Sequence, residues 1–133
     1  MHIMARRFRI TIDGTVYHAA MQDNPLVNRL ASMCPFEQEY TRNTENEYYT
    51  KLVEECSDKG CQMISKAKKN TICFFKGWNA LNFVFYDCDI APFKIAYLGD
   101  MEEDATVQLR NAGKTIRVLC EDITETVGGA KRE

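Results

Sequence analysis

Histidine and long apolar runs are scarce in this sequence of 133 residues, and each scarcity excludes a class of protein. The two histidines, His2 and His18, are accompanied by no Gly-x-Ser-x-Gly and no Cys/His signature, which argues against nucleophilic catalysis. No apolar run approaches the ~18 residues that a membrane-spanning helix needs. We therefore expect neither a hydrolase of these types nor a membrane protein.

A strong net charge is also absent. Seventeen Lys and Arg stand against 19 Asp and Glu, which gives a formal net charge of -2. No global field then draws the chain to phosphate backbones or anionic lipid, so nucleic acid is not an expected partner. The charge is segregated, because residues 37–58 hold seven acids and two bases whereas residues 59–76 hold five lysines and no acid. We interpret these as two solvated segments rather than a docking surface.

Length and composition indicate one folded domain over residues 1–133, with flexible ends at about 1–5 and 124–133. A hydrophobic content of 45% and 14 aromatic residues exclude a disordered chain. No internal repeat, linker or low-complexity block divides it. A chain of 133 residues leaves little room for a second domain.

The six cysteines do not by themselves indicate disulfides. Residues 1–7 lack the apolar core of a secretory signal, so we expect a cytoplasmic protein with reduced thiols. Most of the cysteines should then act as small apolar residues of the core. They are Cys34, Cys56, Cys61, Cys73, Cys88 and Cys120.

The N-terminal third predicts a hairpin, a short helix and an extended segment. Apolar residues alternate over residues 8–12 and 17–21, and the Asp13-Gly14 pair between them favours a two-residue turn, with His18 on the wetter face. Asn24 then caps a helix that has Pro25 at its first position and ends before Pro35. Residues 36–42 follow as an extended segment.

Residues 43–60 are polar and acidic, with no sustained period beyond a possible helical turn at 51–55. We predict a long surface excursion. Beyond it, strands are expected at 61–65, 71–76, 81–86 and 94–98. Eight of the 14 aromatic residues lie between residues 74 and 97, a density that indicates a sheet closed on itself around a core.

The C-terminal part predicts a second short helix, capped by Asp104 and ended by Gly113, and then a last strand. In that strand Ile116, Val118 and Cys120 share one face. The fold class is therefore mainly β, with two short helices.

Several short segments, taken in this order, carry a family resemblance that covers roughly residues 6–122. They are Phe8-Arg9-Ile10-Thr11-Ile12, Tyr17-His18-Ala19-Ala20-Met21-Gln22-Asp23-Asn24-Pro25, Glu47-Tyr48, Leu81-Asn82-Phe83-Val84-Phe85-Tyr86 and Ala96-Tyr97-Leu98-Gly99. With these segments the chain resembles a family of small bacterial cyclophilin-like proteins. The resemblance implies a closed β-barrel of about eight strands with short helices over its open ends.

The resemblance raises prolyl isomerisation as an activity, because cyclophilins catalyse it on the outer face of this barrel. Cyclophilins carry an arginine in a Phe-His-Arg run, whose hydrogen bond weakens the amide resonance. The comparable segment here reads Phe36-Glu37-Gln38-Glu39-Tyr40-Thr41-Arg42, and residues 43–109 contain no arginine. Since a shared fold does not carry a site with it, a weak isomerase is kept only as an alternative.

A zinc site is the other chemistry that the residues suggest. Cys56 and Cys61 have the spacing of half a site, but no second Cys or His pair stands at similar spacing. We therefore predict no metal and no cofactor. General acid–base catalysis by the acidic residues between 37 and 47 stays open, because their burial is not readable from the sequence.

The leading functional hypothesis is a binding module without a catalytic constellation, whose partner is an unknown small molecule or peptide at the barrel surface. A barrel face edged by Trp78, Tyr86, Phe93 and Tyr97 could hold such a ligand. The predicted contact residues, chosen from the segments that carry the resemblance, are Glu47, Tyr48, Tyr86 and Tyr97. Glu47 and Tyr48 could equally fasten the excursion to the barrel. A third hypothesis is a structural or oligomerisation module, and we expect a monomer or weak homodimer.

Overall fold

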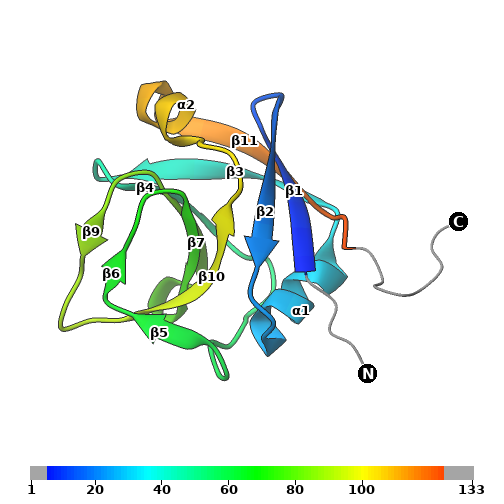
Figure 1. Cartoon of the computed structure of the whole chain (residues 1–133), viewed down its shortest axis with the longest axis vertical. Coiled ribbons are helices and arrows are strands. Elements are labelled where there is room, and N and C mark those ends of the chain that lie inside the picture. Colours follow the sequence, from blue (N-terminus) through cyan, green and yellow to red (C-terminus); the bar gives the residue numbers. More distant parts are fainter. Residues whose placement is uncertain (1–5, 125–133) are drawn as a thin grey trace, which may run out of the picture.

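The computed structural model describes residues 6–124 and is built mainly from strands (Figure 1). Its helices are α1 (Pro25–Met33) and α2 (Thr106–Asn111), and a 3-10 turn spans Lys76–Trp78. The strands are β1 (Arg6–Ile12), β2 (Thr15–Met21), β3 (Phe36–Asn43), β4 (Glu47–Lys51), β5 (Gln62–Ile64), β6 (Lys66–Ala67), β7 (Thr71–Phe75), β8 (Ala80–Val84), β9 (Cys88–Asp89), β10 (Ile95–Met101) and β11 (Thr115–Asp122).

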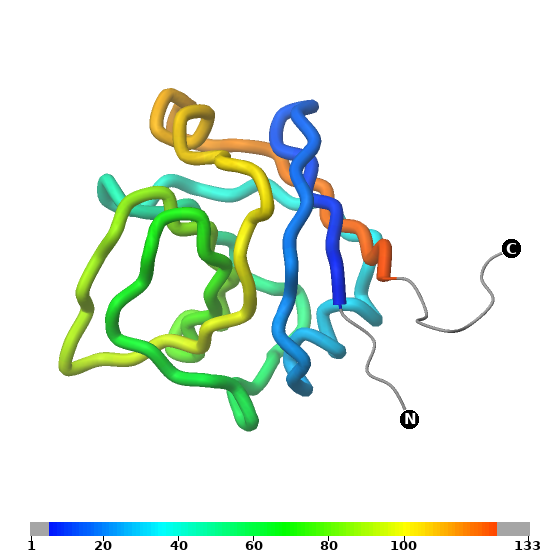
Figure 2. The backbone as a smooth tube through the Cα atoms, in the orientation of Figure 1, coloured from blue at the N-terminus to red at the C-terminus, as the bar shows by residue number. Residues whose placement is uncertain are grey.

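Eight strands close into an antiparallel barrel, as predicted. Their order is β2-β1-β11-β3-β4-β8-β7-β10, and the pairing of β10 with β2 joins the two ends. Gly99 lies at this seam opposite Met21, where a Cβ atom would stand 2.5 Å from the carbonyl oxygen of Ala20. A glycine is therefore required where the barrel closes. β5 pairs with the first residues of β10, and β6 pairs with β9 as a separate two-stranded ribbon; the backbone trace shows their course (Figure 2).

The barrel interior is filled by the inward-facing residues of alternating strands. Phe8, Ile10 and Ile12 of β1 are all less than 3% exposed, which follows from their period of two. Across the barrel, Tyr40 and Phe83 stack with ring centroids 4.8 Å apart. The predicted closed sheet around a ring-rich core is confirmed.

The local signals of the N-terminal third are also confirmed. Asp13 and Gly14 both have positive φ, 47° and 89°, as a two-residue hairpin turn requires. The side chain of Asn24 accepts a hydrogen bond of 2.8 Å from the backbone N–H of Val27, which caps α1.

The prediction of a long surface excursion over residues 43–60 is wrong for its first half. Residues 47–51 form β4, which pairs with β3 and β8 inside the barrel sheet, and residues 51–55 form no helical turn. Tyr48 and Thr50 point inward, whereas Tyr49 faces outward and contacts the ring of Trp78. Because this outward ring is covered as well, the short strand lacks a clear contrast between apolar and polar faces.

Helix α2 begins at Thr106, whose N–H and hydroxyl both donate to the Asp104 carboxylate, at 2.9 and 2.6 Å. Asn70 stands before β7 and adopts a positive φ of 68°. Its amide donates to Asp104 and accepts from the backbone of Ala105, both at 3.0 Å. The turn before β7 is thereby tied to the start of α2.

The predicted flexible ends, 1–5 and 124–133, lie outside the described residues except at Thr124. The hydroxyl oxygen of Thr124 accepts a hydrogen bond of 3.0 Å from the N–H of Arg7. Across residues 6–124, no helix has the length and apolar character needed to cross a membrane.

A second, smaller apolar cluster lies outside the barrel. Its buried members are Ala67, Cys73, Val84 and Ile95, and partly buried apolar residues pack around them. Cys73, Val84 and Ile95 face outward from β7, β8 and β10, while Ala67 comes from the β6–β9 ribbon. The ribbon therefore covers part of the outer face of the barrel, on the side of Figure 1 away from β1 and β2.

Candidate functional site

A hollow of about 230 Å³ lies on the outer face of the barrel, beside this second cluster. We call it the outer hollow. Its walls combine three polar residues, three aromatic rings, two isoleucines and one thiol. The lining residues are Asn43, Glu47, Phe75, Trp78, Asn82, Cys88, Ile90, Phe93 and Ile95.

Strand alternation brings the polar residues together. Asn43 of β3 pairs directly with Glu47 of β4, and Glu47 pairs with Val84 of β8. Asn82 lies two residues before Val84, so its side chain points to the same face and lies diagonal to Glu47. Three neighbouring strands thus supply one cluster of polar side chains.

The carboxylate of Glu47 is the centre of this group. Asn43 Nδ2 donates to its Oε2 at 2.7 Å, and Asn82 Nδ2 donates to its Oε1 at 2.8 Å. Because a carboxylate only accepts, these contacts fix which end of each amide faces Glu47. Asn82 is 3% exposed, and its Oδ1 has no hydrogen-bond partner among the described residues.

Aromatic rings form the apolar wall. Trp78 packs edge-on against Phe75, with centroids 5.7 Å apart, and against Tyr49 at 5.5 Å. Phe93 follows β9 and is 69% exposed. Trp78 is 45% exposed, so both rings have a face that a ligand can cover.

Two thiols lie in or beneath the outer hollow, and both are held in the neutral form. Burial raises the pKa of Cys73 to about 12, and burial together with the negative charge of Glu47 raises the pKa of Cys88. Since the thiolate is the nucleophile, neither cysteine is activated for covalent chemistry.

The structure places one of the four predicted contact residues, Glu47, in the outer hollow. Tyr86 is 59% exposed and Tyr97 is half-buried, with its hydroxyl bonded to the Asp100 carboxylate, and neither lines the hollow. Ligand contact by Tyr48, Tyr86 and Tyr97 stays a prediction. Of the rings predicted to edge a binding face, Trp78 and Phe93 line the hollow.

Tyr48 lies inside the barrel with its ring fully buried. Its hydroxyl donates to the carbonyl of Gly113 at 2.5 Å and accepts from Arg42 Nη1 at 3.1 Å. The same guanidinium lies 4.8 Å above the Phe85 ring and reaches the carbonyl oxygens at the end of α2. Arg42 therefore fastens α2 to the barrel.

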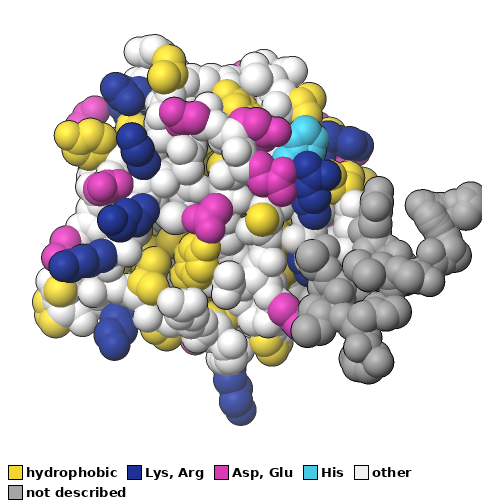
Figure 3. All heavy atoms as spheres, in the orientation of Figure 1, with side chains coloured by type: hydrophobic (Ala, Val, Ile, Leu, Met, Phe, Trp, Pro, Cys, Tyr) yellow, Lys and Arg dark blue, Asp and Glu magenta, His cyan; other side chains and the backbone are white. Residues whose placement is uncertain are grey.

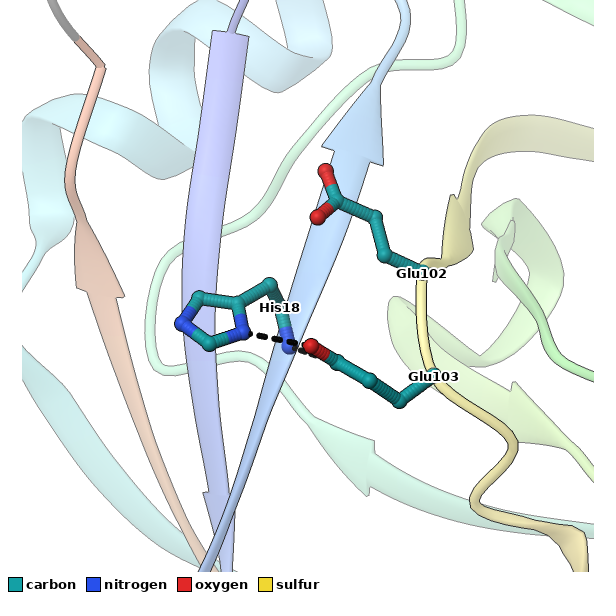
Figure 4. Close-up of side chains that lie close together, drawn as sticks. All are labelled: His18, Glu102 and Glu103. Carbon is teal, nitrogen blue, oxygen red and sulfur yellow. Dashed lines mark hydrogen bonds and ion pairs between the residues drawn. The ribbon is translucent and has the colours of Figure 1, made fainter.

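A cluster of His18, Glu102 and Glu103 joins β2 to the loop after β10 (Figure 4). His18 donates its backbone N–H to Glu103 at 2.7 Å, and its ring Nδ1 lies 2.8 Å from the same carboxylate. Arg7 binds both oxygens of Glu102, at 2.8 and 3.0 Å. Figure 3 shows this mixture of acidic, basic and histidine side chains on the surface. The ion pairs would compete with a metal ion, so we assign the cluster no ligand.

Cys56 and Cys61, whose spacing is compatible with half a zinc site, gain no further ligands among the described residues. Across residues 6–124, neither thiol belongs to a group of three potential metal ligands. Burial is the main cause that raises the pKa of both thiols, which favours their protonated form. All six cysteines are free thiols.

Sequence reasoning missed six of the nine residues that line the site: Asn43, Phe75, Asn82, Cys88, Ile90 and Ile95. A polar Asn82 within the apolar run Ala80–Val84 is the one signal that could have pointed to it. Its pairing with Glu47 depends on the register between β4 and β8, and that register was hidden by the assignment of β4 to a loop.

Comparisons with known proteins agree with the fold. The solution structure of the hypothetical protein AF2241 from Archaeoglobus fulgidus superposes with a TM-score of 0.66 at 15% identity, covering 88% of this chain and 94% of that one. No curated protein sequence matches the chain. The sequence profile of the cyclophilin-like family matches residues 10–121, which span the whole barrel from β1 to β11. The chain therefore belongs to the cyclophilin-like family.

Proposed function

We propose that this protein binds a small ligand in the outer hollow, either a free small molecule or a side chain of a peptide. The observation that carries the proposal is the buried Asn82 amide, whose Oδ1 lacks a partner among residues 6–124. Buried polar atoms are nearly always hydrogen-bonded, and leaving one unpaired costs about 1–3 kcal/mol. A ligand that donates to this oxygen would recover that cost.

The surroundings of Asn82 support the same proposal. Binding sites combine apolar and aromatic walls with a few placed polar groups. The outer hollow combines the exposed rings of Trp78 and Phe93 with the Glu47 carboxylate. Its volume of about 230 Å³ is below the roughly 300–1,000 Å³ of drug-sized sites, which favours a small occupant.

Prolyl isomerisation is less well supported. The cyclophilin mechanism needs an arginine beside the substrate amide, and no arginine lines the hollow within residues 6–124. Arg42 is directed to the barrel interior and to the carbonyls of α2. The lining residues offer no other cationic donor for that role.

The test is a fragment screen followed by amide NMR shifts of the 15N-labelled protein. We expect ligands that shift the lining residues of β4, β7 and β8, and we expect Asn82→Ala to weaken their binding about tenfold, the loss of one buried hydrogen bond. The matched control is Asn28→Ala, which removes an exposed amide on α1. A screen whose hits all map away from the outer hollow would refute the proposal.

A further inference from the structure

The polar side chains of the outer hollow have unused hydrogen-bond acceptors rather than unused donors. Each oxygen of Glu47 accepts one hydrogen bond from an asparagine amide, although a carboxylate offers about four acceptor sites. Asn82 Oδ1 accepts none among the described residues. The amides of Asn43 and Asn82 already direct N–H groups to Glu47, so the unused lone pairs of the Glu47 carboxylate are what the hollow offers a ligand.

The charge of the outer hollow is negative. Its nine lining residues include Glu47 and no Lys, Arg or His. Burial and then the negative charges of Glu47, Asp87 and Asp89 raise the pKa of Cys88, so this thiol adds no charge of its own at neutral pH. In the neighbouring depression, Lys66 and Lys68 stand beside Asp87 and Asp89, and their formal charges cancel. None of the described residues that line the hollow carries a positive charge that would balance the negative charge of Glu47.

The apolar wall is suited to the same kind of ligand. Phe75, Trp78 and Phe93 line the same hollow as the Glu47 carboxylate, and cations bind favourably to the faces of such rings, most of all to that of tryptophan. A negatively charged ligand would meet the Glu47 charge without any positive partner. A neutral ligand would leave that charge unpaired.

We propose that the outer hollow binds a small organic cation, an alkyl- or arylammonium, whose N–H groups donate to the Glu47 carboxylate while its carbon skeleton lies against the aromatic rings. The inference rests on the proposed function, because it names the class of ligand for the same site. It predicts that the hollow prefers cationic ligands to neutral or anionic ligands of the same size, a preference that apolar packing alone would not give.

Trp78 is the single tryptophan of the chain and lines the outer hollow, so its fluorescence reports occupancy. Three probes of matched size separate the charges: benzylammonium, benzyl alcohol and benzoate. We expect benzylammonium to give a saturable change at a dissociation constant at least about tenfold below that of benzyl alcohol, as one charge-assisted hydrogen bond provides. Benzoate should give no saturable change.

Two variants locate the effect. Glu47→Gln should remove the preference and bring the benzylammonium affinity to that of benzyl alcohol. The matched control Glu39→Gln removes an exposed carboxylate from the neighbouring strand β3, outside the hollow, and should leave the preference intact. Phe93→Ala removes an exposed ring, whose loss the fold should tolerate. It should weaken benzylammonium binding about two- to fivefold. Circular dichroism checks that each variant is folded.

The outcomes separate the two proposals. Equal or tighter binding of benzyl alcohol or benzoate at Trp78 overturns the cation inference and leaves the proposed function standing. An unchanged benzylammonium affinity in Glu47→Gln also overturns the inference. A lack of response to all three probes overturns it as well, and the fragment screen then decides by itself whether the hollow binds any ligand.

Discussion

Two neighbouring residues of β4, Tyr48 and Glu47, face opposite sides of the barrel wall and show opposite polar chemistry. Inside, the Tyr48 hydroxyl has both a donor and an acceptor partner, in Arg42 and Gly113. Outside, Glu47 keeps unused acceptor sites beside the unpartnered Oδ1 of Asn82. A completed polar network holds the fold together, whereas an incomplete one is where a ligand can gain hydrogen bonds.

Removal of Arg42 should have the largest effect on stability. Its guanidinium donates to Tyr48 and to the carbonyls of Leu109, Arg110 and Ala112. Arg42→Leu removes this shared donor from all four acceptors, and we expect the free energy of unfolding to fall by about 2–4 kcal/mol. Urea denaturation measures it.

The control is Arg117→Leu, which breaks an exposed pair with Glu37. That loss should stay within about 1 kcal/mol. Equal losses for the two arginine variants would mean that the inner network does not hold α2 to the barrel.

Tyr48→Phe tests the same network with one atom. The Gly113 carbonyl loses its donor while the buried ring is retained, and we expect a loss of about 1–3 kcal/mol in urea denaturation. Tyr86→Phe removes the same atom from an exposed ring and should change stability by less than about 0.5 kcal/mol. A neutral Tyr48→Phe would remove the contrast between the two faces of β4.

The parts of this comparison differ in how far the sequence could foresee them. The hairpin at Asp13-Gly14 and the Asn24 cap are set by residues next to one another, so their prediction is confirmed. Barrel closure was predicted from ring density and the family resemblance, although the need for glycine at position 99 comes from its contacts with the distant Ala20 and Met21. The polar cluster of the hollow depends on the register between β3, β4 and β8, and no local sequence pattern shows how separate strands pair.

Asn82→Asp should make the stability of the protein depend on pH through the outer face of the barrel. The substitution places two carboxyls where one N–H···O contact of 2.8 Å now stands, and like charges at this distance disfavour double ionisation. One carboxyl of the pair then has a raised pKa when folded, so stability is lost as pH rises above about 4. An upward shift of one unit costs about 1.4 kcal/mol at pH 7.

Urea denaturation at pH 5 and pH 7 measures this effect, with the larger loss at pH 7. Asn28→Asp is the control, because its side-chain oxygen already accepts from Arg6 and a carboxylate keeps that bond. A loss that is the same at both pH values would contradict a close contact between residues 47 and 82.

Asp104 gives a smaller pH effect at the start of α2. Hydrogen bonds from Thr106 and Asn70 lower the pKa of this carboxyl from 3.8 to about 2. A lowered pKa in the folded state contributes stability above pH 4, and that contribution is lost as pH falls towards 2. The gap in melting temperature between the wild type and Asp104→Asn should therefore narrow from pH 5 to pH 2. An NMR midpoint of Asp104 near 4 would contradict this.

The smallest expected effect is on prolyl isomerisation, where we expect none. The amide barrier of ~18–20 kcal/mol falls only if a donor reaches the rotating amide, and within residues 6–124 the outer hollow has no arginine for this. A protease-coupled assay on an Ala-Pro peptide should give the uncatalysed rate. Acceleration that Phe93→Ala or Glu47→Gln abolishes, but Arg42→Leu does not, would place catalysis in the hollow itself. The incomplete network outside β4 would then serve a transition state rather than a bound ligand.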